Sequence, residues 1–303
     1  MPHDHHHHHG HLPRAAGDRR MAAAVAVNVG LSVAQIIGGL IAGSVALIAD
    51  GVHNLSDAAA LVLAFGARHL AQRAADPGMS FGWARAEVVA ALVNYVVLIV
   101  IALWLLVEAA GRLADPPGVA GWVVIWLAGL ALLVDLVTAG LTWRLSRESL
   151  NIRAAFLHNL ADAGASVAVI IGGGLILLYD WRLVDPLLTI GISLFILWHV
   201  AGDIRPVLRI LMLGAPVAQD VAQVVARLRA EPAVADVHHV HLWQIDERRT
   251  AFQAHLVVQD GADFAAVIAG AKAMLARDFG LTHATLEPES PALGCADQGA
   301  VGC

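Results

Sequence analysis

Six long apolar stretches occupy most of the 303-residue chain and constrain its fold more than any other feature. Each is close to or above the roughly 20 residues that an α-helix needs to cross the hydrocarbon core of a membrane. Backbone amide groups cannot stay without hydrogen-bond partners in lipid, so we predict that all six are transmembrane helices. They cover residues 21–43, 45–70, 86–112, 119–145, 153–178 and 183–211.

The composition agrees with a protein whose main partner is the lipid bilayer. Charged residues make up 15% of the chain and hydrophobic residues 58%, whereas charged residues make up about 25% of an average soluble domain. The formal net charge of -6 offers no basic surface, which argues against a nucleic acid as a partner.

The hydropathy drops near Gly214, and the rest of the chain has the pattern of a small soluble domain. Helical periodicity and strand-like alternation follow one another in the order α-β-β-α-β, which predicts a compact α+β domain. We therefore predict four parts: a His-rich cytoplasmic tail at 1–20, a six-helix transport domain at 21–212, a cytoplasmic α+β domain at 213–290 and a disordered tail at 291–303.

The arginines indicate which way the chain crosses the membrane. Most of them lie before the first apolar stretch, around the loops after the second and fourth, and at the end of the sixth. Because basic residues gather on the cytoplasmic side, we predict that both termini and the soluble domain are cytoplasmic. The short chain and the lack of a visible targeting segment favour a bacterial inner membrane.

Two apolar stretches carry the same pair of polar residues, His-x-x-x-Asp. The second stretch contains His53 and Asp57, and the fifth contains His158 and Asp162. Spacing of i and i+4 places both side chains of a pair on one helical face. Two such faces packed together would offer two imidazoles and two carboxylates to one ion, a donor set that suits Zn²⁺.

A structural interpretation competes with the metal site, because polar pairs can also hydrogen-bond one helix to another. Ionisable groups inside a membrane are costly, however, and normally mark a pathway or a partner. Two identical pairs on separate stretches favour the metal site. Small residues beside both pairs, Gly51 and Gly164 among them, would let the two helices approach closely.

Several segments resemble the cation diffusion facilitator family, in its zinc-transporting form. They are Ser44 to Leu61, Ser80 to Glu87, His158 to Asp162 and Leu211 to Pro216. The resemblance covers nearly the whole chain after residue 20. It implies six transmembrane helices, a cytoplasmic ferredoxin-like or metallochaperone-like α+β domain, a homodimer, and antiport of a metal ion against protons.

The resemblance also implies roles for particular residues. His53, Asp57, His158 and Asp162 match the family's transport-site positions, and a His at the first position is similar to the zinc-transporting members. The imidazoles favour Zn²⁺ as the transported ion, with Co²⁺, Cd²⁺, Ni²⁺ or Fe²⁺ as possible substrates. A histidine must lose its proton to bind a metal, so we expect metal binding to release protons and to couple efflux to the proton gradient.

The soluble domain carries a second group of candidate ligands. The family's cytoplasmic metal positions correspond best to His238, His255, Glu287 and Glu289. Because alternate residues of a strand share a face, we expect His239 to point away from His238 and His241. Surface histidines of an ordinary strand are the alternative interpretation.

Other polar residues leave alternatives open. Asp135 and Asn28 lie in apolar stretches and would support the site or relay protons, whereas for His199 a structural polar contact is the preferred interpretation. The His3–His11 tract would gather metal as an accessory, or is a purification tag.

Two other function classes remain as alternatives. A membrane-anchored metal sensor would not need polar pairs in mid-membrane. An intramembrane metal-dependent hydrolase would need a general base and an open metal position, and no His-Glu-x-x-His motif is present. We therefore expect a transporter and not an enzyme.

Overall fold

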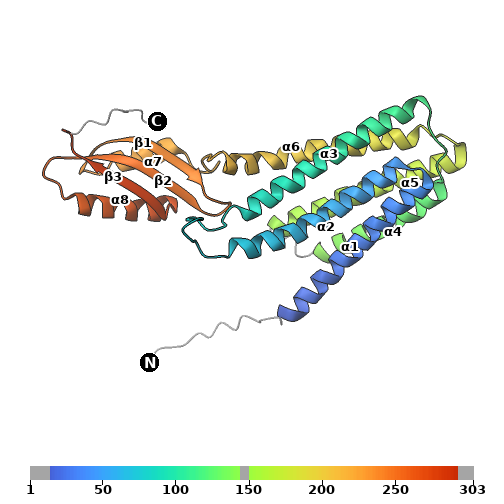
Figure 1. Cartoon of the computed structure of the whole chain (residues 1–303), viewed down its shortest axis with the longest axis horizontal. Helices are drawn as coiled ribbons and strands as arrows, with labels where there is room; N and C mark the ends of the chain where they lie inside the picture. Colours follow the sequence, from blue (N-terminus) through green and yellow to red (C-terminus); the bar gives the residue numbers. More distant parts are fainter. Residues whose placement is uncertain (1–13, 144–149, 293–303) are drawn as a thin grey trace. The chain divides into compact units, whose positions relative to one another are not determined.

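The computed structural model describes residues 14–143 and 150–292. Within these ranges the chain forms eight helices and three strands (Figure 1). The His3–His11 tract and residues 293–303 of the predicted C-terminal tail lie outside the described residues. The elements are α1 (Arg14–Ala42), α2 (Val45–Ala71), α3 (Ala86–Ala114), α4 (Gly121–Thr142), α5 (Leu150–Tyr179), α6 (Val184–Leu211), α7 (Val221–Arg229), β1 (Val234–Gln244), β2 (Thr250–Val258), α8 (Phe264–Phe279) and β3 (His283–Glu289).

The six predicted transmembrane stretches each form one helix, α1 to α6. Among the described residues, five of these helices are long and apolar enough to cross a membrane, and α1 adds the shorter apolar segment Ala26–Ala42. Helix α1 begins at Arg14, seven residues before the predicted stretch. The chain is therefore a multi-pass membrane protein that also carries a C-terminal α+β domain with a three-stranded sheet, as the sequence predicts.

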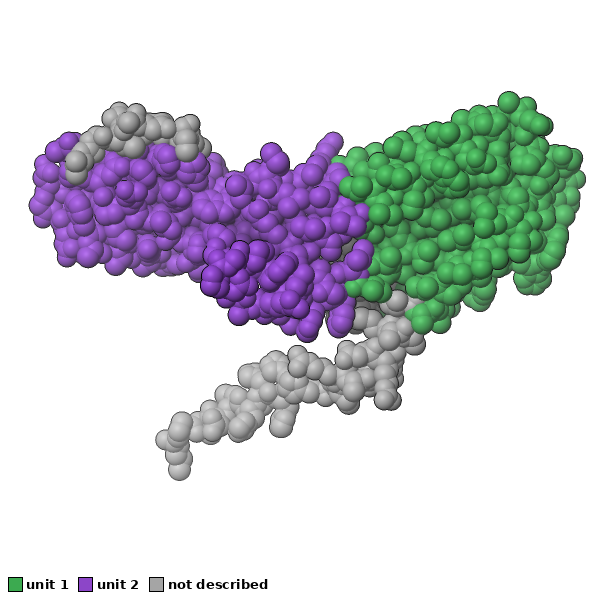
Figure 2. Space-filling model, viewed as in Figure 1, with its two compact units in different colours: residues 1–62, 94–201 green, residues 63–93, 202–303 purple. Residues whose placement is uncertain are grey.

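The chain divides into two compact units, which Figure 2 shows in different colours. Unit 1 contains residues 1–62 and 94–201, and unit 2 contains residues 63–93 and 202–303. The division falls inside helices α2, α3 and α6, so unit 2 holds the α+β domain together with the end of α2, the start of α3 and the end of α6. The predicted domain boundary at residues 212 and 213 stays a prediction.

Close packing in unit 1 depends on small residues. Where α4 meets α5, a Cβ on Gly121 would lie 2.6 Å from the carbonyl oxygen of Gly173, so only glycine fits there. Where α2 meets α1, a Cβ on Gly51 would lie 2.8 Å from the Cβ of Gln35. Such contacts let the backbones of membrane helices approach closely. They bring the polar residues of neighbouring helices within reach of one another.

The start of α2 is anchored by two other helices of unit 1. Asp185, in the first turn of α6, accepts hydrogen bonds from the Ser44 hydroxyl and, at 2.9 Å, from the backbone N–H of Val45. Arg112 of α3 donates to the carbonyl oxygen of Gly43 at 2.7 Å. The first N–H groups of a helix have no partner within the helix, so a carboxylate at this position stabilises the helix start.

The α+β domain is a three-stranded sheet with two helices. Strands β1 and β2 pair antiparallel, β2 and β3 pair parallel, and the strand order is β1-β2-β3. Side chains of α7 and α8 share one apolar core with the sheet, including the fully buried Leu228, Phe252 and Leu275. Asp220 and Asp263 cap the two helices, each by accepting hydrogen bonds from backbone N–H groups.

Candidate metal centre

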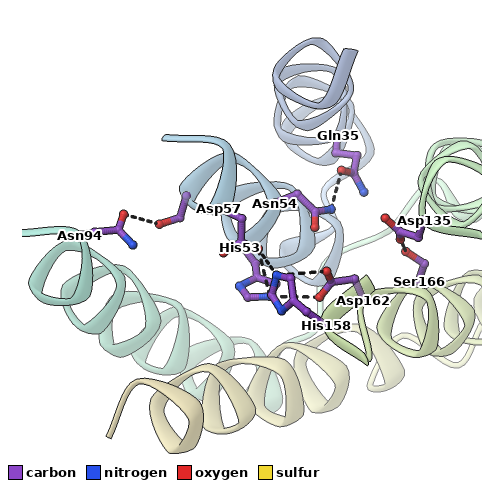
Figure 3. A network of polar contacts seen from close by, with 10 residues as sticks. Gln35, His53, Asn54, Asp57, Asn94, Asp135, His158, Asp162 and Ser166 are labelled. Carbon is purple, nitrogen blue, oxygen red and sulfur yellow. Dashed lines mark hydrogen bonds and ion pairs between the residues drawn. The ribbon is translucent and has the colours of Figure 1, made fainter. Parts of the chain in front are cut away.

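The two His-x-x-x-Asp pairs meet inside unit 1, as Figure 3 shows. His53 and Asp57 project from α2, and His158 and Asp162 project from α5. One oxygen of Asp57 lies 3.1 Å from Nε2 of His158 and 3.7 Å from Nε2 of His53. The Asp162 carboxylate lies 3.4 Å from His53 and 3.5 Å from His158. Each carboxylate therefore faces both imidazoles.

The donor atoms of this group are close enough to hold one ion. Those of His53, Asp57 and Asp162 all lie within 4.8 Å of one another, and His158 joins them through its two contacts to the carboxylates. His53 and Asp162 are buried, with 9% and 7% of their surface exposed. The contacts of His53 to the carboxylates are longer than a good hydrogen bond. Two imidazoles and two carboxylates form a donor set suited to zinc and related ions.

A network of hydrogen-bonded polar side chains lies beside the four residues. Asn54 donates to the side-chain oxygen of Gln35 at 3.3 Å, and Gln35 donates to Asp50 at 2.6 Å. All three are buried, so α1 and α2 are joined by a chain of hydrogen bonds one turn from His53. The sequence analysis did not identify Gln35, although an amide in an apolar stretch is itself a signal.

Two further contacts link neighbouring helices near the four residues. The hydroxyl of Ser166 on α5 lies 3.5 Å from the Asp135 carboxylate on α4 (Figure 3). Ser56 of α2 donates to Asn94 of α3 at 3.2 Å. Ser166 follows Asp162 by one helical turn, so Asp135 lies next to the site from a third helix. These contacts orient the helices that carry the ligands, and sequence reasoning alone did not find Ser166 or Asn94.

A second cluster lies on the sheet of the α+β domain. His238 of β1 and His255 of β2 are directly paired across the antiparallel ladder. Glu289 of β3 lies 3.3 Å from Nε2 of His238 and 2.7 Å from Nδ1 of His255. One donor atom from each of these three residues lies within 4.8 Å of the others. The structure thus brings together three of the four predicted cytoplasmic ligands.

Glu287, the fourth predicted ligand, occupies a different place. Its carboxylate lies 3.4 Å from Nε2 of His255, whereas Glu289 contacts Nδ1 of the same ring. The two nitrogens of an imidazole point in different directions, so one ion on the Glu289 side cannot also contact Glu287 through His255. A carboxylate at the second nitrogen of a metal-binding histidine fixes the orientation of its ring.

The prediction that His239 points away from His241 is wrong. The register of β1 and β2 shifts between His238 and His241, and His239 adopts a φ of 50°. This bulge inserts one extra residue, so the regular alternation of faces is lost. The ring of His239 lies 4.9 Å from that of His241 and 4.6 Å from that of His255, measured between ring centroids.

Comparison with known proteins places these clusters in a family. The sequence model of the cation efflux transmembrane domain matches residues 21–212, and that of the cytoplasmic domain of cation efflux proteins matches residues 216–291. Both clusters lie within these matched regions. The zinc transporter ZitB of Escherichia coli is 35% identical over 291 residues, which cover 95% of this chain and 93% of that protein.

Other relatives are similar over nearly the same length. The metal cation efflux system protein CzcD of Cupriavidus metallidurans is 31% identical over 95% of this chain and 89% of its own. The cadmium, cobalt and zinc/H⁺-K⁺ antiporter of Bacillus subtilis is 31% identical over 87% and 86%.

Among solved structures, the metal-bound C-terminal domain of the Cupriavidus CzcD transporter is 28% identical. It covers 23% of this chain and 99% of that domain, with a TM-score of 0.23. The two matched domains and the full-length relatives together establish that this chain belongs to the cation efflux family of membrane transporters, the cation diffusion facilitators, which are not enzymes.

Proposed function

We propose that this protein exports Zn²⁺ from the cytoplasm in exchange for protons, and that His53, Asp57, His158 and Asp162 bind the ion during transport. The observation that carries the proposal is the convergence of these four donors on two helices inside the membrane-spanning region. A carboxylate in mid-membrane costs about 3 kcal/mol. A transported cation bound between the two carboxylates and the two imidazoles would offset this cost.

The proton coupling follows from the chemistry of the ligands. An imidazole with an ordinary pKa near 6.5 must be neutral to bind a metal. In the absence of the ion, protonated imidazoles can pair with Asp57 and Asp162, whose oxygens lie 3.1 to 3.7 Å from them. Zinc arriving from the cytoplasm displaces these protons, and protons arriving from outside displace the zinc. The name of the Bacillus relative, an antiporter, supports this exchange.

The substrate follows from the donor set and from the relatives. Imidazole nitrogen selects zinc over harder ions such as Mn²⁺ or Mg²⁺. The names of the relatives mention zinc, cadmium and cobalt. Zinc is therefore the proposed physiological ion, with Co²⁺, Cd²⁺, Ni²⁺ and Fe²⁺ as further candidates.

The proposal includes the setting in which transport takes place. The arginine distribution supports a cytoplasmic location of both termini, and the bacterial relatives favour the inner membrane. We take the functional form to be a homodimer, in keeping with the matched cytoplasmic domain. In that domain His238, His255 and Glu289 would hold a metal ion, and Glu287 would orient His255.

The test is zinc uptake into proteoliposomes with an acidic lumen, for wild type and for Asp162→Ala. Zinc accumulation that the pH gradient drives, and that Asp162→Ala abolishes, is the expected result. Asp115→Ala is the matched control, because Asp115 is an exposed carboxylate in the loop after α3, and it should transport like wild type. Equal uptake by wild type and Asp162→Ala, or uptake indifferent to the gradient, would remove the basis of the proposal.

A further inference from the structure

His158 and Asp57 form the more open side of the four-residue site. Their side chains are 37% and 29% exposed, whereas those of His53 and Asp162 are 11% and 9% exposed. His158 is thus the more exposed of the two site histidines. A metal ion that approaches or leaves the site on this side passes close to the ring of His158.

A third imidazole lies beside that ring. His199 projects from α6, a helix that contributes none of the four ligands. Its ring centroid is 6.3 Å from that of His158, with 23° between the ring planes. For comparison, the two imidazoles of the site, His53 and His158, are 6.0 Å apart. His199 is thus nearly as close to His158 as the two site histidines are to each other.

The position of His199 is defined by its own helix. Phe195 precedes it by one turn, and the two rings lie 6.2 Å apart with 21° between their planes. Rings at such separations interact favourably. Phe195, His199 and His158 therefore form a row that ends at the site, and His199 itself is exposed. An imidazole beside His158 is placed to contact an ion that the four-residue site is about to take up or has just released.

We propose that His199 is a fifth metal-binding residue, which shares the zinc ion with His158 while the ion moves between the four-residue site and the outside of that site. The sequence favoured a structural contact for His199, and the proximity of its ring to His158 is what changes the assignment. A neutral imidazole is a good zinc ligand. An ion shared by His158 and His199 keeps at least one nitrogen ligand while it moves. This inference rests on the proposed function, because it requires zinc at the four-residue site.

The test distinguishes the effect of the two ring nitrogens of His199 from the effect of its aromatic ring. His199→Phe keeps an aromatic ring against His158 and Phe195 but removes both nitrogens, whereas His199→Gln keeps a polar donor and loses the ring. Trp198→Phe is the matched control, because Trp198 is exposed on the same helix and its ring contact is with Phe195. Zinc KM and maximal rate are measured in proteoliposomes, together with the visible absorption of bound Co²⁺, which reports the number of ligands.

We expect His199→Phe to raise the zinc KM about tenfold with a smaller change in maximal rate, and to alter the Co²⁺ spectrum. His199→Gln should stay nearer to wild type, and Trp198→Phe should match wild type. A wild-type KM and Co²⁺ spectrum in His199→Phe would overturn the inference. So would a larger defect in His199→Gln than in His199→Phe, because the ring of His199 and not its nitrogens would then be what transport requires.

The parallel measurement on Asp162→Ala keeps the two proposals apart. If wild type transports zinc and Asp162→Ala does not, the proposed function stands, whatever the His199 variants do. If Asp162→Ala transports as well as wild type, the four-residue site itself is rejected and the assignment of His199 falls with it.

Discussion

The transmembrane cluster takes two candidate ligands from each of two helices, whereas the cluster of the matched cytoplasmic domain takes one candidate from each of three strands. In a helix, residues four apart share a face whatever the rest of the fold does. His53 and Asp57 are therefore placed together by local structure alone, and so are His158 and Asp162. The packing of α2 against α5 is then sufficient to bring the four side chains together.

The cytoplasmic cluster depends on long-range pairing instead. His238 meets His255 only because the β1–β2 register pairs them, and Glu289 arrives through the parallel pairing of β3 with β2. A shift of the register by one residue would turn a strand's side chains to the other face. Candidate ligands on one helix can therefore be recognised from their spacing in the sequence. Candidate ligands on different strands can be recognised only once the pairing register of the strands is known.

The sharpest test of this contrast compares one ligand from each cluster. Asp57 contacts both imidazoles of its site, and removing it leaves the buried His53 with one carboxylate partner fewer. We expect Asp57→Ala to lower the initial rate of zinc uptake about 100-fold or more, and Glu289→Ala to keep most of it. Similar losses in the two variants would mean that transport requires both clusters equally.

The second prediction concerns metal preference. Exchanging an imidazole for a carboxylate replaces a softer donor with a harder one. His158→Asp should therefore lower the preference for zinc over manganese about tenfold, measured by competition between the two ions for uptake. His255→Asp is the counterpart in the cytoplasmic cluster and should leave the transport preference unchanged. A changed preference in His255→Asp would contradict the separation of the two roles.

The third prediction concerns the bulge in β1. A non-glycine residue with positive φ costs about 1 kcal/mol or more, and His239 has a φ of 50°. His239→Gly should therefore stabilise the β1–β2 hairpin and slow its amide hydrogen exchange about fivefold, measured in the purified full-length protein. His241→Gly is the control and should weaken the strand, because glycine is unfavourable where φ is ordinary. Faster exchange in His239→Gly would show that the bulge does not strain the backbone.

The smallest expected effect is at the turn between β1 and β2. Partial burial acts to raise the pKa of Asp246, but hydrogen bonds from the backbone N–H groups of Arg248 and Arg249 and from the Arg249 side chain outweigh it and lower the pKa below its ordinary value of 3.8. A lowered pKa in the folded state contributes stability above pH 3.8, and this contribution is lost as the pH falls through the lower, folded-state pKa.

The measurement is protection of the turn from hydrogen exchange, corrected for the intrinsic effect of pH on exchange. Protection should fall in acid in the wild type, and this part of the pH dependence should be absent in Asp246→Asn. An identical acid response in both proteins would assign the effect to other groups.

The transmembrane helices and the pairing of polar residues on α2 and α5 could be predicted because both follow from local sequence. Apolar length defines α1 to α6, and the i, i+4 spacing defines the two pairs. Ser166 and Gln35 were not foreseen, because their partners Asp135 and Asp50 lie on other helices and helix rotation cannot be read from one sequence.

In the α+β domain, the order of elements was predictable from the periodicity of apolar residues, but the position of His239 was not. No glycine marks the bulge, and a histidine with positive φ has no distinctive sequence signal. The different contacts of Glu287 and Glu289 could not be predicted for a related reason. Glu287 and Glu289 lie on one strand two residues apart, and only the orientation of the His255 ring assigns them to different nitrogens.

Hydrogen bonds from Val45 to Asp185 and from Arg112 to Gly43 hold the start of α2 in place. We take this end as the pivot of any tilt of α2. At 1.5 Å per residue, Asp57 lies about 18 Å along the helix from Val45. A tilt of about 10° around the pivot would therefore carry the Asp57 carboxylate about 3 Å sideways. Its 3.1 Å contact with His158 could not survive that displacement. If Asp57 binds the ion as proposed, a small tilt of α2 is thus sufficient to withdraw one of its ligands.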